Sequence, residues 1–291
     1  MKPAPFEYVD PDDVTAVLDV LAERVAGGDD VVLLAGGQSL VPLMNLRLAQ
    51  PDVVIDLRRC GELRSVRVDD AGVTAGALVT AAELLEHTEA SALPGLAEAL
   101  GHVGHPQIRN RTTIGGSIAH ADPAAELPAL LVALDGHVVV ARRARAERRV
   151  SADEWFLGPT STAREPDELL VAVHLPRLDG RVAVMEVGDR PGDFAVVGVV
   201  VAVGVGDDHR IVVFGAGGRP QRLRGAEAVL REVLDEHQRR SAPLDAVIAA
   251  VRRDTEASGD VHAPAEYRRH VAGTLVGRAL AHVLHLGTAA A

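Results

Sequence analysis

The order in which strand and helix patterns follow one another restricts the fold of this chain more than any other feature. Up to residue 176 the two kinds of pattern are mixed, and the turn-forming segment Pro176–Gly180 then marks the expected boundary between two domains. Beyond it come three strand patterns and then three helical ones, near residues 182–187, 194–205, 210–214, 225–237, 243–257 and 264–285. A mixed part followed by separate runs of strands and helices predicts an α+β fold.

Capping signals predict where helices start in the mixed part. Asp10 and Pro11 are expected to open a helix as its cap and first residue, and Asp122 and Pro123 are expected to open another. Capping boxes at Thr80 and Ser151, each with a glutamate three residues later, predict two more. The expected strands, hairpin and surface loop span residues 31–34, 53–57, 64–77 and 158–167. Aromatic residues make up only 2% of the chain, so its core must consist of Val, Leu, Ala and Ile.

Residue usage excludes several kinds of site. Cys60 is the only cysteine, so the chain forms neither an internal disulfide nor a cysteine-ligated zinc or iron–sulfur site. Lys2 is the only lysine, which excludes a Walker A phosphate loop. The formal net charge of −11 argues against a nucleic-acid partner, which normally needs a basic surface. The histidines lack partners at metal-ligand spacing, so no metal site is expected.

The sequence also bears on where the protein works. The first ten residues contain no apolar signal segment, and the longest apolar stretch, Phe194–Val205, is too short to span a bilayer. We therefore expect a cytoplasmic protein without a transmembrane segment.

Two segments, Gly36–Ser39 and Thr113–Ser117, share a form in which an apolar run leads into two glycines and a small polar residue. The glycines let the backbone approach a ligand and present successive N–H groups, as in the nests that bind phosphate oxygens. Two nests suit a diphosphate held between two lobes, although each segment alone could be an ordinary tight turn. The run Gly215–Gly218 is not a Rossmann fingerprint, because Pro220 takes the place of the third glycine.

Longer stretches around these glycines carry a family resemblance. The first reads A-G-G-Q-S-L-V-P-L-M over Ala35–Met44, and the second reads T-I-G-G-S-I-A-H-A-D-P-A-A-E-L-P over Thr113–Pro128. Together with Gly104–Arg111, Gly192–Gly198 and Glu266–His270, they resemble the FAD-binding medium subunit of the molybdenum hydroxylase family, of the carbon monoxide dehydrogenase and xanthine dehydrogenase type. The stretch around the second glycine pair is the specific signal, and the resemblance extends over essentially the whole chain.

The resemblance implies a fold of the p-cresol methylhydroxylase type. Residues 1–177 would form an FAD-binding domain of two α+β lobes, approximately 1–57 and 58–177. Residues 178–291 would form a C-terminal flavoprotein domain with a small antiparallel sheet and helices.

The resemblance also implies which residues bind FAD. In the family, the two glycine segments hold the diphosphate, an acidic residue in the following helix contacts the ribose region, and a leucine packs beside the flavin. The matching residues are Ala35, Gly36, Gly37, Gln38, Ser39, Leu40, Thr113, Ile114, Gly115, Gly116 and Ser117 in the two segments, Asp122 and Glu126 around the start of the next helix, and Leu170. No residue is assigned a catalytic role.

The residues before Gly192 depart from the family pattern. The family usually has a lysine and two arginines there, and their places are held by Glu186, Asp189 and Arg190. If Glu186 faces the flavin, its negative charge makes the flavin harder to reduce than a lysine would. If the register of its strand differs, Glu186 points to water and has no such effect.

The function implied is that of an FAD-dependent oxidoreductase subunit in a hetero-oligomer. It would accept electrons from iron–sulfur clusters of one partner subunit and pass them to an external acceptor, while a large partner subunit carries molybdopterin. A chain with a single cysteine fits this division of labour. Two alternatives remain: a stand-alone FAD-dependent oxidase acting on a small molecule, and an assembly subunit without flavin.

Overall fold

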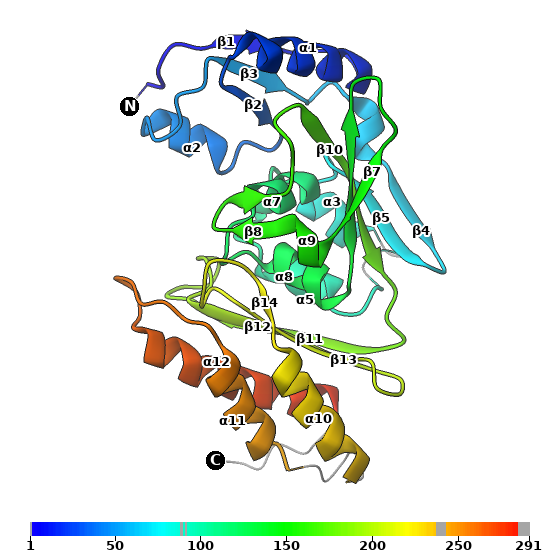
Figure 1. Ribbon diagram of the computed structural model, residues 1–291, viewed down its shortest axis with the longest axis vertical. Coiled ribbons are helices and arrows are strands. Elements are labelled where there is room, and N and C mark those ends of the chain that lie inside the picture. The colour runs from blue at the N-terminus through cyan, green and yellow to red at the C-terminus, as the bar shows by residue number, and fades with distance from the viewer. Residues whose placement is uncertain (1, 88–89, 91, 237–242, 285–291) are drawn as a thin grey trace.

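Three of the four sheets follow one another along the long axis of the molecule, each with its own helices, and the fourth is a two-stranded hairpin (Figure 1). The computed structural model describes residues 2–87, 90, 92–236 and 243–284. We call the three parts the N-terminal, middle and C-terminal lobes.

The N-terminal lobe is a parallel sheet with two helices. Its elements are β1 (Glu7–Val9), α1 (Val14–Gly27), β2 (Val31–Leu34), α2 (Leu40–Asn45) and β3 (Val53–Asp56), with β3 between β1 and β2. α1 buries Val17 and Leu21 in a core that it shares with β3. Because all three strands run in the same direction, their carboxyl ends lie at one edge of the sheet.

The first helix starts later than expected. Asp13, rather than Asp10, caps α1, because its backbone is extended and its side chain accepts a hydrogen bond of 2.8 Å from the amide of Ala16. Asp10 instead lies 3.7 Å from a guanidinium nitrogen of Arg58. The expected start at Asp10 and Pro11 is therefore wrong.

The middle lobe is an antiparallel sheet with helices on one face (Figure 1). Its strands, in spatial order, are β4 (Val66–Asp69), β5 (Gly72–Gly76), β10 (Glu168–Pro176), β6 (His137–Arg142) and β7 (Arg148–Ser151). Its helices are the 3-10 helix η1 (Gly61–Arg64), α3 (Ala81–Glu86), α5 (Leu96–His102), α6 (Pro106–Arg109), α7 (Ile114–His120), α8 (Glu126–Ala133) and α9 (Ala152–Trp155). The pairing of β4 with β5 confirms the hairpin expected at residues 64–77.

One of the two expected capping boxes is present. Thr80 accepts a hydrogen bond of 3.1 Å from the amide of Glu83, whose carboxylate accepts one of 2.7 Å from the amide of Thr80. The box at Ser151 is wrong, because its hydroxyl donates to the carboxylate of Glu154 at 2.7 Å and caps no backbone amide.

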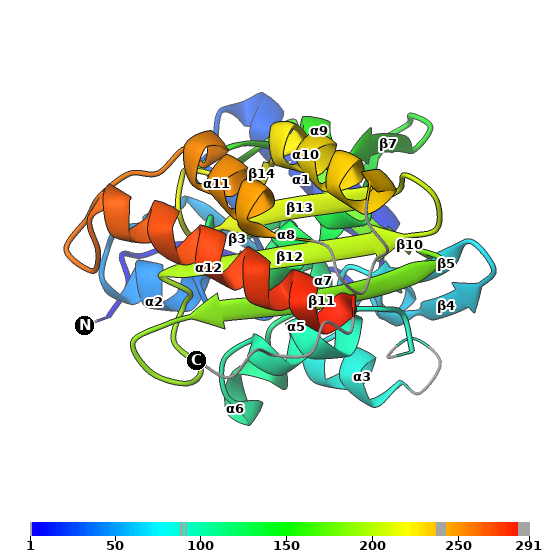
Figure 2. The ribbon, with the colours of Figure 1, turned by 90° about the horizontal axis from the view of Figure 1, so that it is seen from below.

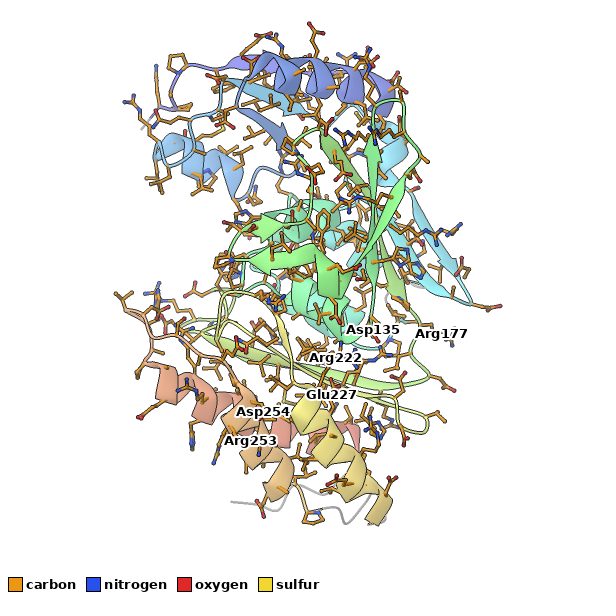
Figure 3. All side chains as sticks on the ribbon, viewed as in Figure 1. Asp135, Arg177, Arg222, Glu227, Arg253 and Asp254 are labelled. Atoms are coloured by element: carbon orange, nitrogen blue, oxygen red, sulfur yellow. The ribbon has the colours of Figure 1, made fainter. Side chains whose placement is uncertain are left out.

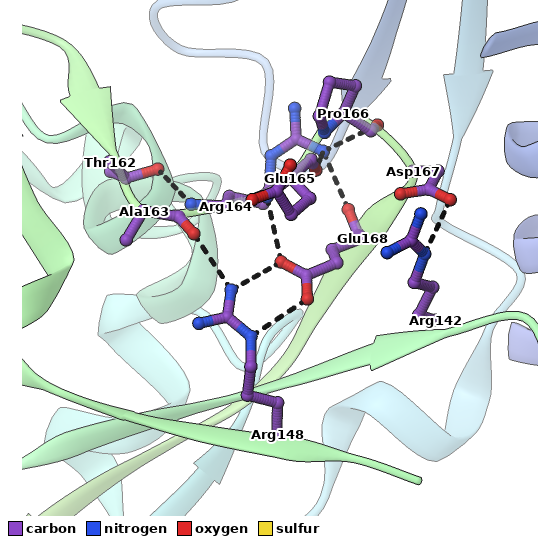
Figure 4. A network of polar contacts seen from close by, with 9 residues as sticks. All are labelled: Arg142, Arg148, Thr162, Ala163, Arg164, Glu165, Pro166, Asp167 and Glu168. Carbon is purple, nitrogen blue, oxygen red and sulfur yellow. Dashed lines mark hydrogen bonds and ion pairs between the residues drawn. The ribbon is translucent and has the colours of Figure 1, made fainter. Parts of the chain in front are cut away.

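Residues 158–167, expected to be a plain surface loop, are held by a short hairpin and a polar network. The hairpin pairs β8 (Phe156–Gly158) with β9 (Ser161–Thr162). The carboxylate of Glu168 accepts two hydrogen bonds from Arg148, of 3.0 and 2.7 Å, and Arg164 donates to the carbonyl of Glu168 at 2.7 Å (Figure 4). Since Glu168 is only 5% exposed, these partners compensate for burying its charge.

The C-terminal lobe is an antiparallel sheet with three helices on its outer face (Figure 2). Its strands, in spatial order, are β11 (Gly180–Val187), β12 (Val197–Gly204), β13 (His209–Phe214) and β14 (Gln221–Arg222). The helices are α10 (Arg224–Glu236), α11 (Asp245–Asp254) and α12 (Ala265–Val283). The strands and helices expected for this part of the chain are therefore confirmed within the described residues.

Three hydrophobic cores hold the molecule together, one of them between the C-terminal sheet and its helices. Residues on the inner face of the C-terminal sheet, such as Val184 and Val200, belong to the same core as Leu130 and Val138 of the middle lobe. The N-terminal and middle lobes share a smaller core, to which the middle lobe contributes Leu63, Leu78 and Leu169. The expected α+β fold, with two lobes and a C-terminal part built from a small antiparallel sheet and helices, is confirmed. No helix in the described ranges has the length and apolarity needed to cross a membrane.

Candidate cofactor site

The first glycine segment is a turn that leaves its backbone amides open. It connects β2 to α2, and Gly37 adopts a left-handed φ of 76°. None of the backbone N–H groups of residues 36–40 donates a hydrogen bond within the described chain. We call these five N–H groups the open amides. An amide left without a partner in the protein is available to a ligand or to water.

The second glycine segment is not a loop but the start of helix α7. Thr113 caps this helix, and its hydroxyl accepts a hydrogen bond of 3.1 Å from the amide of Gly116. The amides of Ile114, Gly115 and Ser117 donate to the carbonyls of Val79, Ala77 and Thr113, at 2.8, 3.0 and 3.0 Å. The expectation of a second nest of open amides is therefore wrong, because every amide of residues 114–117 has a partner in the chain.

The two segments touch each other. A Cβ added to Gly36 would overlap the carbonyl oxygen of Arg111, so this approach depends on glycine. A Cβ at Gly116 would lie 3.6 Å from Cβ of Ala35. The fold thus brings the two sequence motifs together between the N-terminal and middle lobes.

A cavity of about 720 Å³ opens beside this contact. The N-terminal lobe and the residues that follow β3 line it with Leu34, Ala35, Gly36, Gly37, Gln38, Val41, Pro42, Asp56 and Arg58. The middle lobe lines it with Arg64, Leu78, Thr80, Ala82, Glu83, Glu86, Asn110, Arg111 and Thr113. Its volume is in the range of small-molecule and cofactor sites, about 300–1,000 Å³.

Part of the residue set expected from the sequence lines this cavity. Ala35, Gly36, Gly37, Gln38 and Thr113 do so. Ser39 and Leu40 continue the first segment, and Ile114 and Gly115 are buried behind the second. Ser117, Asp122, Glu126, Leu170 and Glu186 are not among the lining residues.

Asp56 is a lining residue that was not anticipated. It ends β3, is 6% exposed, and accepts hydrogen bonds of 2.7 Å from the hydroxyl of Tyr8 and 2.9 Å from the amide of Arg58. The hydrogen bond to Asp56 raises the pKa of Tyr8. A carboxylate at the carboxyl end of a parallel strand is a signal visible in the sequence, since ligands often bind at that edge. The other lining residues that the sequence did not predict, such as Arg64, Glu83 and Arg111, come together only through the tertiary fold.

Glu186 points into the joint between the middle and C-terminal lobes and not to water. Its side chain is 10% exposed, and one carboxylate oxygen lies 3.2 Å from Nδ1 of His102, while Oε2 has no partner. The hydrogen bond to Glu186 raises the pKa of His102. Burial, with the nearby charge of Glu186, raises the pKa of Glu126 to about 7. Glu126 and Glu186 thus belong to one buried acidic cluster.

Leu170 and Asp122 also lie away from the cavity. Leu170 is 4% exposed within the core of the middle lobe. Asp122, expected to open a helix, instead accepts a hydrogen bond of 2.9 Å from the amide of Ala124 in the turn before α8. Helix α8 begins at Glu126, so the expected helix start is wrong.

A smaller cavity of about 310 Å³ lies between the middle and C-terminal lobes. Two of its three arginines have acidic partners: Arg222 contacts Glu227 at 2.9 Å and Asp135 at 2.6 Å, and Arg224 contacts Asp153 at 2.5 Å (Figure 3 shows the first three). The third, Arg219, donates to the carbonyl of Phe156 at 3.1 Å. Because Asp153, Asp254 and Glu256 also line this cavity, it is a weak candidate for an anionic ligand.

The larger cavity has features that suit a cofactor with a diphosphate. A diphosphate can accept hydrogen bonds from the open amides, and Gly36 lets the backbone come close to it because it has no side chain. No group of three His, Cys, Asp or Glu in the described residues could hold a metal ion. Cys60 is buried, and burial raises the pKa of its thiol to about 11, so it is not a nucleophile.

Comparison with known proteins agrees with this geometry. Residues 4–178 match the FAD binding domain in molybdopterin dehydrogenase, and residues 183–283 match the CO dehydrogenase flavoprotein C-terminal domain. The chain is 39% identical to the 6-hydroxypseudooxynicotine dehydrogenase complex subunit alpha of Paenarthrobacter nicotinovorans, over 98% of this chain and 96% of that protein. It is 35% identical to the carbon monoxide dehydrogenase medium chain of Hydrogenophaga pseudoflava, over 96% and 97%.

A solved structure of a related protein has the same fold. A chain in carbon monoxide dehydrogenase from Hydrogenophaga pseudoflava, in a form that lacks the Mo-pyranopterin moiety of its molybdenum cofactor, superposes with a TM-score of 0.88 at 33% identity. The match covers 98% of this chain and 99% of that chain. The likeness therefore includes all three lobes.

Proposed function

This chain belongs to the family of FAD-binding subunits of molybdenum-hydroxylase-type dehydrogenases, and we propose that it passes electrons from a partner subunit through FAD to an external acceptor. The resemblance found in the sequence is thereby confirmed. Bound FAD supplies the redox chemistry, since it can accept electrons from one-electron donors and release them to a different acceptor.

The observation that carries the proposal is the set of open amides beside the 720 Å³ cavity. The amides of Gly36–Leu40 donate to the FAD phosphates, and Gly36 allows the backbone to approach them. Thr113 and Gly116 hold the opposite wall in place through the helix cap. Asp56, at the carboxyl edge of the N-terminal sheet, accepts hydrogen bonds from the adenosine half.

The remaining residues matched to the family are proposed as further contacts of FAD. Ser117 lies beside the diphosphate, Asp122 and Glu126 near the ribose region, and Leu170 and Glu186 beside the flavin; Glu126 and Glu186 share a buried cluster. A carboxylate of Glu186 close to the flavin disfavours its reduction. Glu186→Lys should then raise the flavin midpoint potential. An unchanged potential would show that Glu186 does not act on the flavin and only contacts His102 between the middle and C-terminal lobes.

The proposal includes partner subunits. Iron–sulfur clusters and molybdopterin belong to two other chains of a cytoplasmic hetero-oligomer, because the only cysteine here is buried and cannot ligate a cluster. We place the boundary of the FAD-binding domain at residue 177, with lobes at approximately 1–57 and 58–177, and the C-terminal domain at 178–291. The substrate of the assembly binds to another subunit.

Native purification tests this proposal. The chain should copurify with two other subunits, and the complex should contain FAD, iron and molybdenum. A chain that purifies alone with FAD and oxidises a small molecule would favour the stand-alone oxidase. A chain that copurifies with other subunits but binds no flavin after incubation with excess FAD would favour the assembly subunit.

A further inference from the structure

Three arginines line the proposed FAD cavity, and one of them has no acidic partner. Arg58 lies 3.5 Å from the carboxylate of Asp56, and Arg64 lies 3.8 Å from that of Glu83. The guanidinium of Arg111 forms no hydrogen bond or ion pair within the described chain. Arg111 is therefore the cavity arginine whose charge is available to a ligand.

The backbone of Arg111 is fixed although its side chain is exposed. Its amide donates to the carbonyl of Ile108 at 3.0 Å, and the next carbonyl, of Thr112, accepts from Ala81 at 2.8 Å. The carbonyl of Arg111 is the atom against which Gly36 packs. The side chain thus starts from a rigid point directly beside the open amides.

The charges around the cavity favour a cationic partner for a bound diphosphate. A diphosphate linking two nucleoside groups carries two negative charges, and backbone amides carry no formal charge. Of the acidic lining residues, Asp56 and Glu83 are paired with arginines, and Glu86 forms no ion pair in the described chain. A guanidinium can donate two parallel hydrogen bonds to phosphate oxygens, which makes Arg111 suited to this charge.

We propose that Arg111 is a positioning residue that binds the FAD diphosphate from the side opposite the open amides. The amides hold the phosphates from the N-terminal lobe, and Arg111 holds them from the middle lobe. This arrangement rests on the proposed function, since it requires FAD in the cavity. It also links the two lobes through the cofactor.

Titration of the flavin-free full chain with FAD and with riboflavin tests the proposal, because riboflavin lacks the diphosphate. Arg111→Gln should weaken FAD binding by about tenfold to a hundredfold and leave riboflavin binding unchanged. Arg111→Lys should fall between the two, since it keeps the charge but loses the paired hydrogen bonds. The dependence of FAD affinity on salt concentration should also be weaker in Arg111→Gln.

A matched control is Arg67→Gln on β4, an exposed arginine that does not line the cavity and should leave FAD affinity unchanged. Equal FAD affinity of wild type and Arg111→Gln would overturn the proposal while the function stands. Equal losses for FAD and riboflavin would also overturn it, because the effect would not come from the diphosphate. A wild type that binds no FAD would instead overturn the proposed function itself.

Discussion

The two glycine segments look alike in the sequence but differ in what their backbone offers. The amides of residues 36–40 have no partner in the described chain, whereas those of residues 114–117 are all hydrogen-bonded. In the first segment glycine permits a turn and leaves donors open. In the second, glycine permits close packing of a helix start against Ala77. In the proposed function, the first segment therefore binds the ligand, and the second supports the wall on which Thr113 and Arg111 lie.

This difference shows that a pair of glycines does not by itself make a phosphate-binding site. What decides is whether neighbouring carbonyls already accept hydrogen bonds from its amides, as those of Val79 and Ala77 do for the second segment. The carboxyl edge of the N-terminal sheet leaves the first segment without such neighbours. The cavity lies at the joint between the N-terminal and middle lobes, beside the core that these two lobes share.

The largest effect is expected at Gly36. In Gly36→Ala the new Cβ overlaps the carbonyl of Arg111 and separates the two segments. We expect FAD affinity to fall by about a hundredfold or more, since the backbone cannot yield as a side chain can. The measurement is FAD titration, with Gly27→Ala as the control because no atom lies within 4 Å of its added Cβ. Unchanged FAD affinity in Gly36→Ala would contradict the role of the first segment in FAD binding.

Helix α8, beyond the second segment, is expected to affect stability in a pH-dependent way. The pKa of buried Glu126 is raised to about 7 from 4.5, so ionisation of Glu126 destabilises the fold as pH rises through this interval. Glu126→Gln should match the wild type near pH 4 and be more stable by about 3 kcal/mol at pH 8. Urea unfolding at several pH values measures this, and a difference independent of pH would contradict it.

Gly115 should affect folding more than cofactor binding. In Gly115→Ala the new Cβ lies 2.5 Å from Cβ and 2.6 Å from Cα of Ala77, so the backbone has to move to make room. We expect a loss of about 2 kcal/mol in the free energy of unfolding. The FAD affinity of the folded fraction should change less than in Gly36→Ala. The control is Gly101→Ala, whose Cβ meets no atom within 4 Å; a greater loss of FAD affinity at Gly115 than at Gly36 would reverse the roles of the segments.

Gly37 shows whether the turn of the first segment is what places the open amides. Its φ of 76° is unfavourable for alanine, by about 1–2 kcal/mol. Part of this cost should appear as weaker FAD binding, because the turn places the open amides. FAD titration and urea unfolding of Gly37→Ala measure the two parts. Loss of stability with unchanged affinity would show that the turn does not place the amides.

The smallest effect is expected at Gly116. In Gly116→Ala the new Cβ meets the hydroxyl of Thr113 at 2.6 Å, an atom that can rotate away. Alanine also favours the helix more than glycine does. FAD affinity should stay within about threefold of the wild type. A loss comparable to that of Gly36→Ala would mean that the second segment contacts phosphate directly.

The sequence predicted most of the fold because hydrophobic periodicity and turn residues act locally. The strands of the C-terminal lobe and the hairpin β4–β5 lie where expected. The start of α1 was missed because Asp10 and Asp13 both suit a cap, and only the tertiary contact of Asp10 with Arg58 separates them.

The site was predictable only in part. Gly36 and Thr113 could be found because their residue types are needed locally for a turn and a helix cap. The partner of each amide could not, since Val79 and Ala77 are far from the second segment in sequence. The orientation of Glu186 toward His102 depends on strand register, and the freedom of Arg111 depends on which carboxylates lie near it.

Amide hydrogen exchange with and without FAD tests the central claim most directly. The account predicts that the amides of residues 36–40 exchange rapidly in the flavin-free chain and become strongly protected when FAD binds. The amides of residues 114–117 should already be protected without FAD and change little. Strong FAD-dependent protection of residues 114–117, with residues 36–40 still exchanging rapidly, would contradict it.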